Sequence, residues 1–422
     1  MATCDSATGS RQCCCSKRNA TAVPDFLERL LSARFVVAVL SFMTICALAA
    51  TLSLGKRPSQ QFSEHNWASW AFQDFLTVRE KPQVVFLGSS LVLVPVAGVD
   101  ANFLNRRLDG SQHHRSFYFE QRFKEATGAP VRTFNLALPG EMPSDAYLMT
   151  DFLLDGEKKP DILIYGVGPR DFMDNILPSP ASTDAFHSLA RLGDVSRLLD
   201  RVMPEWTDKL NFKLGRTFYL YGKKEDLSVA ASRLSSSVLA RLAPVPPGKS
   251  AFTVEQRRQL MPLYHPCELT AGDAFFRPSR SEQSIDNLAE YRKRYATVRW
   301  DTFATQMRFF TELLDVARQR EIHVVVVSMP VTDINRSLIA DYAWLAYRQS
   351  VHVLATLKGA TFIDLQGSGA FKTADFMDTV HLHSGGGKKM LDIIVDTLAQ
   401  RASCALSAKP DVQKLCNSTQ AL

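Results

Sequence analysis

Five short apolar segments, each rich in β-branched residues, constrain the fold of this chain more than any other feature. They cover residues 83–87, 131–135, 161–165, 323–328 and 361–364, and helix-like or irregular sequence separates them. This alternation is typical of a parallel sheet with helices on both faces. The run 324–327 is four consecutive valines, without the period-two pattern of a half-exposed strand. We therefore expect an α/β domain over residues 82–400 with a central five-stranded parallel sheet.

Residues 177–300 interrupt this alternation with prolines and helix-like stretches. We expect a mostly helical insertion or cap, packed over the carboxyl ends of the strands, where open α/β sheets bind ligands. With 46% hydrophobic and 22% charged residues among 422, the chain can bury a large core, which excludes global disorder. The net charge of +6 is spread along the chain, so nucleic acid is not an expected partner.

Residues 35–54 form an uncharged apolar run of a length that crosses the ~30 Å hydrocarbon core of a bilayer. More cations precede this run than closely follow it, and the positive-inside rule then places residues 1–34 in the cytoplasm and the main domain outside. A cleaved signal peptide is the competing interpretation, because residues 47–49 read Ala-Leu-Ala, but the 34-residue leader argues against it. Both interpretations export most of the chain.

Two flanking segments complete the expected organisation. Residues 55–81 contain aromatic residues at helical spacing and predict a stalk or docking helix, and residues 401–422 form a C-terminal tail. Cys404 and Cys416 could close a short loop in an oxidising compartment, or both could stay free thiols. The chain has no pair of Cys-x-x-Cys motifs, and we expect neither a structural zinc site nor a cofactor.

Polar residues follow three of the predicted strands. Ser89 and Ser90 come after Gly88 at the end of the first, where a serine at a helix N-terminus can face a crevice lined by backbone N–H groups. Helix capping is the alternative role for such a serine. After the third strand, residues 168–171 read Gly-Pro-Arg-Asp, a loop suited to close approach of a ligand.

The loop before the last helix carries Asp378, His381 and His383. An aspartate three residues before a histidine can accept from one ring nitrogen and leave the other as a general base towards a serine. The two histidines with Asp378 also admit a metal site, but a fourth donor is missing, and we expect no metal. We expect His381, and not His383, to act as the base.

In this order, the segments resemble those of the SGNH/GDSL hydrolase superfamily, over residues 82–400. The resemblance implies a flavodoxin-like three-layer α/β/α sandwich, with Ser90 as nucleophile, His381 as base and Asp378 as its partner. Gly140, in the Asn-Leu-Ala-Leu-Pro-Gly stretch after the second strand, matches the oxyanion-hole glycine. Arg170 stands where the family has its oxyanion-hole asparagine, and Ser89 where it has an aspartate.

One N-terminal anchor before such a domain also looks like the membrane-anchored envelope members of this superfamily, among them the D-alanyl transfer protein of the teichoic-acid pathway and alginate acetylation proteins. The resemblance implies an exported serine esterase or O-acyltransferase acting on acyl esters of envelope carbohydrate or lipid. The replacements at Arg170 and Ser89 favour the alternative, a non-catalytic module for polysaccharide binding or assembly on the same fold. Hydrolysis and transfer differ only in whether water or a sugar hydroxyl attacks the acyl-enzyme, so the choice between them stays open.

Overall fold

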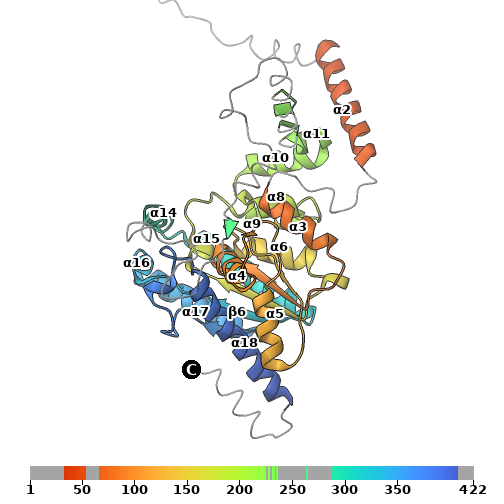
Figure 1. Ribbon diagram of the computed structural model, residues 1–422. Helices are drawn as coiled ribbons and strands as arrows, with labels where there is room; N and C mark the ends of the chain where they lie inside the picture. The colour runs from red at the N-terminus through yellow and green to blue at the C-terminus, as the bar shows by residue number, and fades with distance from the viewer. Residues whose placement is uncertain are drawn as a thin grey trace, which may run out of the picture. The chain divides into compact units, whose positions relative to one another are not determined.

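The computed structural model describes residues 33–53, 66–224 and 287–406, together with 227–228, 231–232, 234–235 and 263–264 (Figure 1). The chain divides into two compact units. The first consists of Met1–Gly55 and Phe212–Lys224, and the second of Lys56–Asn211 and Glu225–Leu422. The second unit contains the sheet and every candidate site residue named above.

The sheet of the second unit has five strands, all parallel, in the order β3-β1-β4-β6-β7. The strands are β1 (Val84–Gly88), β3 (Thr133–Asn135), β4 (Ile162–Val167), β6 (His323–Ser328) and β7 (Thr361–Asp364). Each falls on one of the five predicted segments, so the expected parallel sheet is confirmed. Every residue of β1 is buried, as expected for a strand covered on both faces.

The helices that contact the sheet pack into two groups. One group is α4 (Ser90–Phe103), α5 (Phe117–Thr127) and α18 (Ser384–Leu406). The other centres on α15 (Trp300–Gln319), with α6 (Pro143–Leu153), α7 (Pro169–Met173) and α17 (Asp341–Leu357) packed against it. α15 buries an apolar stripe that includes Phe303, Phe310 and Leu314. The final helix ends at Leu406, six residues beyond the expected domain limit of 400.

Most of the described insertion is helical, as expected. Its helices are η3 (Pro180–Ser182), α8 (Asp184–Leu189), η4 (Ser196–Leu198), α9 (Leu199–Val202), α10 (Trp206–Thr217), α11 (Tyr219–Gly222) and α14 (Leu288–Arg294). It also contributes one strand that the sequence did not predict. This strand, β5 (Leu263–Tyr264), pairs antiparallel with β2 (Leu108–Asp109) outside the main sheet.

The segment expected to form a stalk packs into the second unit over its described part. Helix α3 (Trp67–Thr77) buries seven of its eleven residues, and its Ser69 hydroxyl lies 2.9 Å from that of Ser188 in α8. The aromatic residues that predicted an amphipathic helix thus cover the domain itself. Short helices η2 (Gly156–Lys158), α16 (Asp333–Arg336) and η6 (Thr373–Asp375) complete the described elements of this unit.

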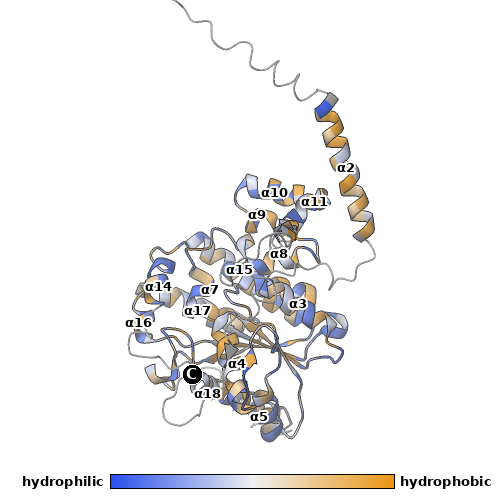
Figure 2. Ribbon diagram, turned by 45° about the horizontal axis from the view of Figure 1, so that its top comes forward, coloured by the Kyte–Doolittle hydropathy of each residue, from blue (hydrophilic) through white to orange (hydrophobic). Residues whose placement is uncertain are grey.

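The first unit contains the apolar helix α2 (Ala33–Ser53), most of which is coloured as hydrophobic in Figure 2. Its span Arg34–Leu52 has a mean hydropathy of 2.4 and is long enough to cross a membrane. α11 packs against α2, and the rings of Phe42 and Phe218 lie 5.9 Å apart. The expected cytoplasmic tail up to residue 32 and Cys416, half of the possible disulfide, lie outside the described residues.

Candidate active site

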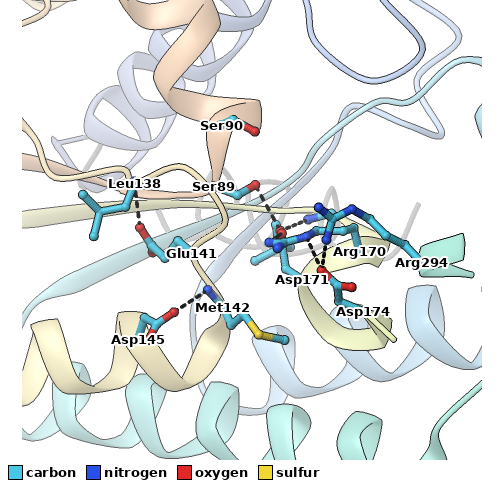
Figure 3. Close-up of polar contacts among 12 residues, drawn as sticks. Ser89, Ser90, Leu138, Glu141, Met142, Asp145, Arg170, Asp171, Asp174 and Arg294 are labelled. Atoms are coloured by element: carbon cyan, nitrogen blue, oxygen red, sulfur yellow. Dashed lines mark hydrogen bonds and ion pairs between the residues drawn. The ribbon is translucent and has the colours of Figure 1, made fainter. Parts of the chain in front are cut away.

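Ser90 is the first residue of α4, immediately after β1 (Figure 3). The turn into the helix requires Gly88, which has φ +140° and leaves no room for a side chain. A Cβ there would lie 2.5 Å from the Gly166 carbonyl oxygen and 2.6 Å from a methyl group of Val92. Because the first N–H groups of a helix have no intrahelical acceptor, the Ser90 hydroxyl stands beside free backbone donors.

The structure brings Ser90, His381 and Asp378 into one hydrogen-bonded series. His381 Nε2 lies 2.7 Å from Ser90 Oγ, and His381 Nδ1 lies 2.6 Å from Asp378 Oδ2. The other oxygen of Asp378 accepts from the backbone N–H groups of Val380 and His381, at 2.8 and 2.7 Å. Asp378 thus accepts Nδ1–H and leaves Nε2 free to accept the serine proton.

The pKa of Asp378 reflects this arrangement. Burial acts to raise it, but the hydrogen bond and charge of His381 and the two backbone N–H groups outweigh burial, so the pKa lies below its ordinary value. Asp378 is therefore ionised at neutral pH and can stabilise a protonated His381.

His383 has a different set of partners. Its Nε2 lies 2.5 Å from the Ala374 carbonyl oxygen, and its Nδ1 accepts from the Gly385 N–H at 2.8 Å. The two ring nitrogens are engaged by backbone groups of η6 and of the start of α18, and the ring does not line the pocket that holds Ser90. This geometry gives His383 a structural role.

The two oxyanion-hole candidates lie side by side. Gly140 has φ +78°, and a Cβ at that position would lie 3.3 Å from Arg170 Nη2. Glu141, which sequence reasoning missed, closes the turn that carries Gly140. Its backbone N–H donates to the Leu138 carbonyl at 3.1 Å, and its Oε2 accepts from the Leu138 N–H at 3.2 Å.

Arg170 is held by carboxylates (Figure 3). Its Nε lies 2.9 Å from Asp174 Oδ2, its Nη1 lies 3.5 Å from Asp171 Oδ1, and Arg294 pairs with the same Asp174. Nη1 is buried and makes no hydrogen bond within the described residues. Asp171 also accepts from the Gly168 N–H at 2.8 Å, with the Ser89 hydroxyl at the 3.5 Å limit. The guanidinium is thus fixed beside the glycine with one donor group unsatisfied.

Three buried carboxyl groups near Arg170 have raised pKa values. Burial raises the pKa of Asp171 to about 6, against the lowering effect of the Arg170 charge. Burial raises the pKa of Asp145 to about 7, although the Thr183 hydroxyl and the Met142 N–H donate to it. Burial, and then the charge of Asp145, raises the pKa of Glu141 well above its usual range. Burial thus favours the neutral form of all three carboxyl groups near Arg170.

The candidate site lies in a pocket of about 330 Å³. All five predicted site residues line this pocket: Ser90, Gly140, Arg170, Asp378 and His381. Four further residues that line the pocket come from the end of the insertion. They are the N-cap residue of α14 and three residues of that helix: Asn287, Glu290, Tyr291 and Arg294. The expected cap thus contributes one wall of the site. Sequence reasoning missed these four residues, although their spacing of three, four and seven is that of one helix face.

Comparison with known proteins does not assign this site to a family. No protein-family model matches the chain, and no curated protein matches it.

Proposed function

We propose that this chain is a membrane-anchored serine esterase or O-acyltransferase of the SGNH/GDSL type, acting on acyl esters of envelope carbohydrate or lipid. The observation that carries this proposal is the series Asp378–His381–Ser90, with contacts of 2.6 and 2.7 Å at the mouth of a pocket. A flavodoxin-like three-layer sandwich is part of the proposal, supported by the strand order and the two helix groups.

In the proposed reaction, Ser90 Oγ attacks the acyl carbonyl carbon and its proton passes to His381 Nε2. The ester bond to the alcohol breaks, and the departing oxygen takes that proton from His381. Water or a sugar hydroxyl then gives its proton to His381 and attacks the acyl carbon. The bond from that carbon to Ser90 Oγ breaks, and His381 returns the proton to Oγ. Asp378 holds His381 in the required tautomer throughout.

Gly140, Arg170 and the first N–H groups of α4 are the proposed donors to the oxyanion. The guanidinium can substitute for an asparagine because it donates N–H groups and carries a charge that strengthens each bond. Its ion pair with Asp174 favours the alternative, a non-catalytic binding module, because a paired guanidinium is partly neutralised. The unsatisfied Nη1 supports the catalytic role.

A fluorophosphonate probe tests the proposal, because it labels only an activated serine. We expect the full chain in detergent to be labelled at Ser90, and Ser90→Ala to abolish labelling. Ser89→Ala, which removes the adjacent buried hydroxyl, is the matched control and should keep labelling. A wild-type protein that stays unlabelled would favour the binding module.

The orientation is also part of the proposal. The excess of cations before α2 supports a cytoplasmic N-terminus and an extracytoplasmic domain. Protease added to intact spheroplasts should then digest the chain after residue 55. A domain that stays protected until the membrane is opened would contradict this orientation.

A further inference from the structure

One face of α14 forms a wall of the candidate active site. Asn287, Glu290, Tyr291 and Arg294 all line the pocket. The helix is fixed at both ends. The Asn287 side chain accepts from Thr379 Oγ1 at 2.6 Å, and the Arg294 carbonyl accepts from the Asn175 N–H at 3.1 Å. This wall is therefore a built part of the site.

The hydrogen bonds around Thr379 fix the orientation of the Asn287 amide. Asn335 Nδ2 donates to the Thr379 hydroxyl at 3.1 Å, and that hydroxyl donates its single proton to Asn287 Oδ1. The amide oxygen of Asn287 is thus the end that faces Thr379. Its Nδ2 group points elsewhere, and it is buried without a hydrogen-bond partner among the described residues.

Helix capping does not account for Asn287. Asparagine is a favoured N-cap residue because its side chain accepts from the first turn of the helix. Asn287 occupies the N-cap position of α14, yet its side chain makes no capping bond. A buried donor without a partner is destabilising, and a bound ligand oxygen would remove that cost.

The position of Asn287 indicates which part of a substrate it meets. Asn287 is hydrogen-bonded to Thr379, which follows Asp378 in the loop that carries His381. Gly140 lies instead beside Arg170. In a serine acyl transfer, the histidine gives its proton to the alcohol oxygen, while the oxyanion donors hold the carbonyl oxygen. Asn287 therefore stands on the alcohol side of the reaction.

Resting on the proposed acyl-transfer function, we propose that Asn287 binds the alcohol component of the substrate, by donating from Nδ2 to an oxygen of a carbohydrate. The other side chains of the wall fit this class. Glu290 and Arg294 are polar, and Tyr291 offers an aromatic ring with a polar end. A wall of this composition binds a polyhydroxylated ligand better than an acyl chain.

Two substrates and two variants of the full chain in detergent micelles test this role. p-Nitrophenyl acetate has no sugar, whereas an O-acetylated xylo-oligosaccharide presents hydroxyl groups next to the ester. Asn287→Asp keeps the oxygen that accepts from Thr379 and removes the donor. We expect its kcat/KM for the acetylated sugar to fall about 10- to 100-fold, and that for the aryl ester to stay within about threefold.

The matched control is Tyr295→Phe, which removes another buried hydroxyl without a partner among the described residues, from the C-cap of α14 outside the pocket lining. It should leave both kcat/KM values unchanged. The pH profile of aryl ester hydrolysis separates the added charge of Asn287→Asp from the lost donor, because an effect through His381 would displace that profile. We expect the profile to stay in place.

Each other outcome overturns the inference. If Asn287→Asp and wild type have equal activity on both substrates, the role of Asn287 is only to hold Thr379 in place. An equal loss on both would give it a role in the acyl step. Turnover of the aryl ester but not the sugar by wild type would reject the carbohydrate class. A wild-type protein that turns over neither and resists the fluorophosphonate would instead refute the proposed function itself.

Discussion

The two ends of the candidate site differ in how their residues are held. At one end, Asp378 and His381 lie three residues apart, and the loop that joins them also supplies the N–H groups that position the carboxylate. At the other end, Gly140 comes from the loop after β3 and Arg170 from α7, which follows β4, and Asp171 and Asp174 hold the guanidinium. The first end is built within one loop, whereas the second joins residues of a loop, α7 and α14.

This difference determines what each end can tolerate. The geometry of a local motif depends on few other parts of the chain. The three-residue spacing of Asp378 and His381 within one loop places a carboxylate beside Nδ1. The position of Arg170 depends instead on a buried ion pair, in which the loss of one partner leaves an uncompensated charge.

The largest effect is expected at His381. His381→Ala removes the base that accepts the Ser90 proton, and we expect the rate of labelling to fall by at least about 10³-fold. His383→Ala is the control two residues away. It removes bonds to Ala374 and Gly385, which costs stability of about 1–3 kcal/mol, but it should keep labelling where the protein is folded. If both variants fold and lose labelling equally, the assignment of His381 as the base is wrong.

A smaller effect is expected at Arg170. Arg170→Gln removes the charged donor next to Gly140, and we expect kcat for an aryl ester to fall about 10- to 10³-fold with little change in KM. Arg294→Gln removes the other cation paired with Asp174 and is the matched control. If both variants lose activity equally, neutralisation of Asp174, and not donation to an oxyanion, is the role of Arg170.

The same contrast explains what the sequence could predict. The five strands follow from β-branched runs, and the Ser90, His381 and Asp378 series from residues at strand ends and within one loop. Both signals are local. Asp171 and Asp174 follow Arg170 by one and four residues, so both could be named from sequence as its partners. That Arg294 of α14 shares Asp174 could not be predicted, because only the fold brings α14 to α7.

Two further segments show what a local pattern leaves open. Trp67 and Trp70 predicted an amphipathic stalk or docking helix, and the sequence could not choose between these; in the fold the helix packs on the domain. Asn287 precedes a helix and would be assigned as an N-cap from sequence alone. Its bond to Thr379, 92 residues away, is visible only in the fold.

Gly140 lies at the Arg170 end of the site, and a substitution there should have a smaller effect than loss of the guanidinium. Gly140→Ala places a Cβ 3.3 Å from Arg170 Nη2 at a backbone φ of +78°, which costs about 1–2 kcal/mol for a residue with a side chain. We expect kcat for the aryl ester to fall about tenfold. The control is Gly128→Ala, at φ +76° with no atom within 4 Å of the added Cβ, which should lower stability but not kcat. Unchanged kcat in Gly140→Ala would exclude this turn from the oxyanion site.

A change in stability, and not in activity, is expected from the buried carboxyl groups behind Arg170. Burial raises the pKa of Asp145 to about 7, so the folded protein holds a proton that the unfolded chain releases at about pH 4. The unfolding free energy supplied by Asp145 must then fall as pH rises from about 4 to about 7, and stay level above that. Asp145→Asn is neutral at every pH, so its stability relative to wild type should rise over the same interval. Urea unfolding of the full chain in micelles at pH 4 to 8 measures this difference.

Asp161→Asn serves as the control for that experiment, because its carboxylate is 57% exposed and pairs with Lys81 at the surface. Its unfolding free energy should run parallel to that of wild type between pH 4 and 7. If Asp145→Asn also runs parallel, Asp145 titrates alike in the folded and unfolded chain. The Arg170 end would then be open to water, and Arg170 would be a weaker donor to an oxyanion than a dry site allows.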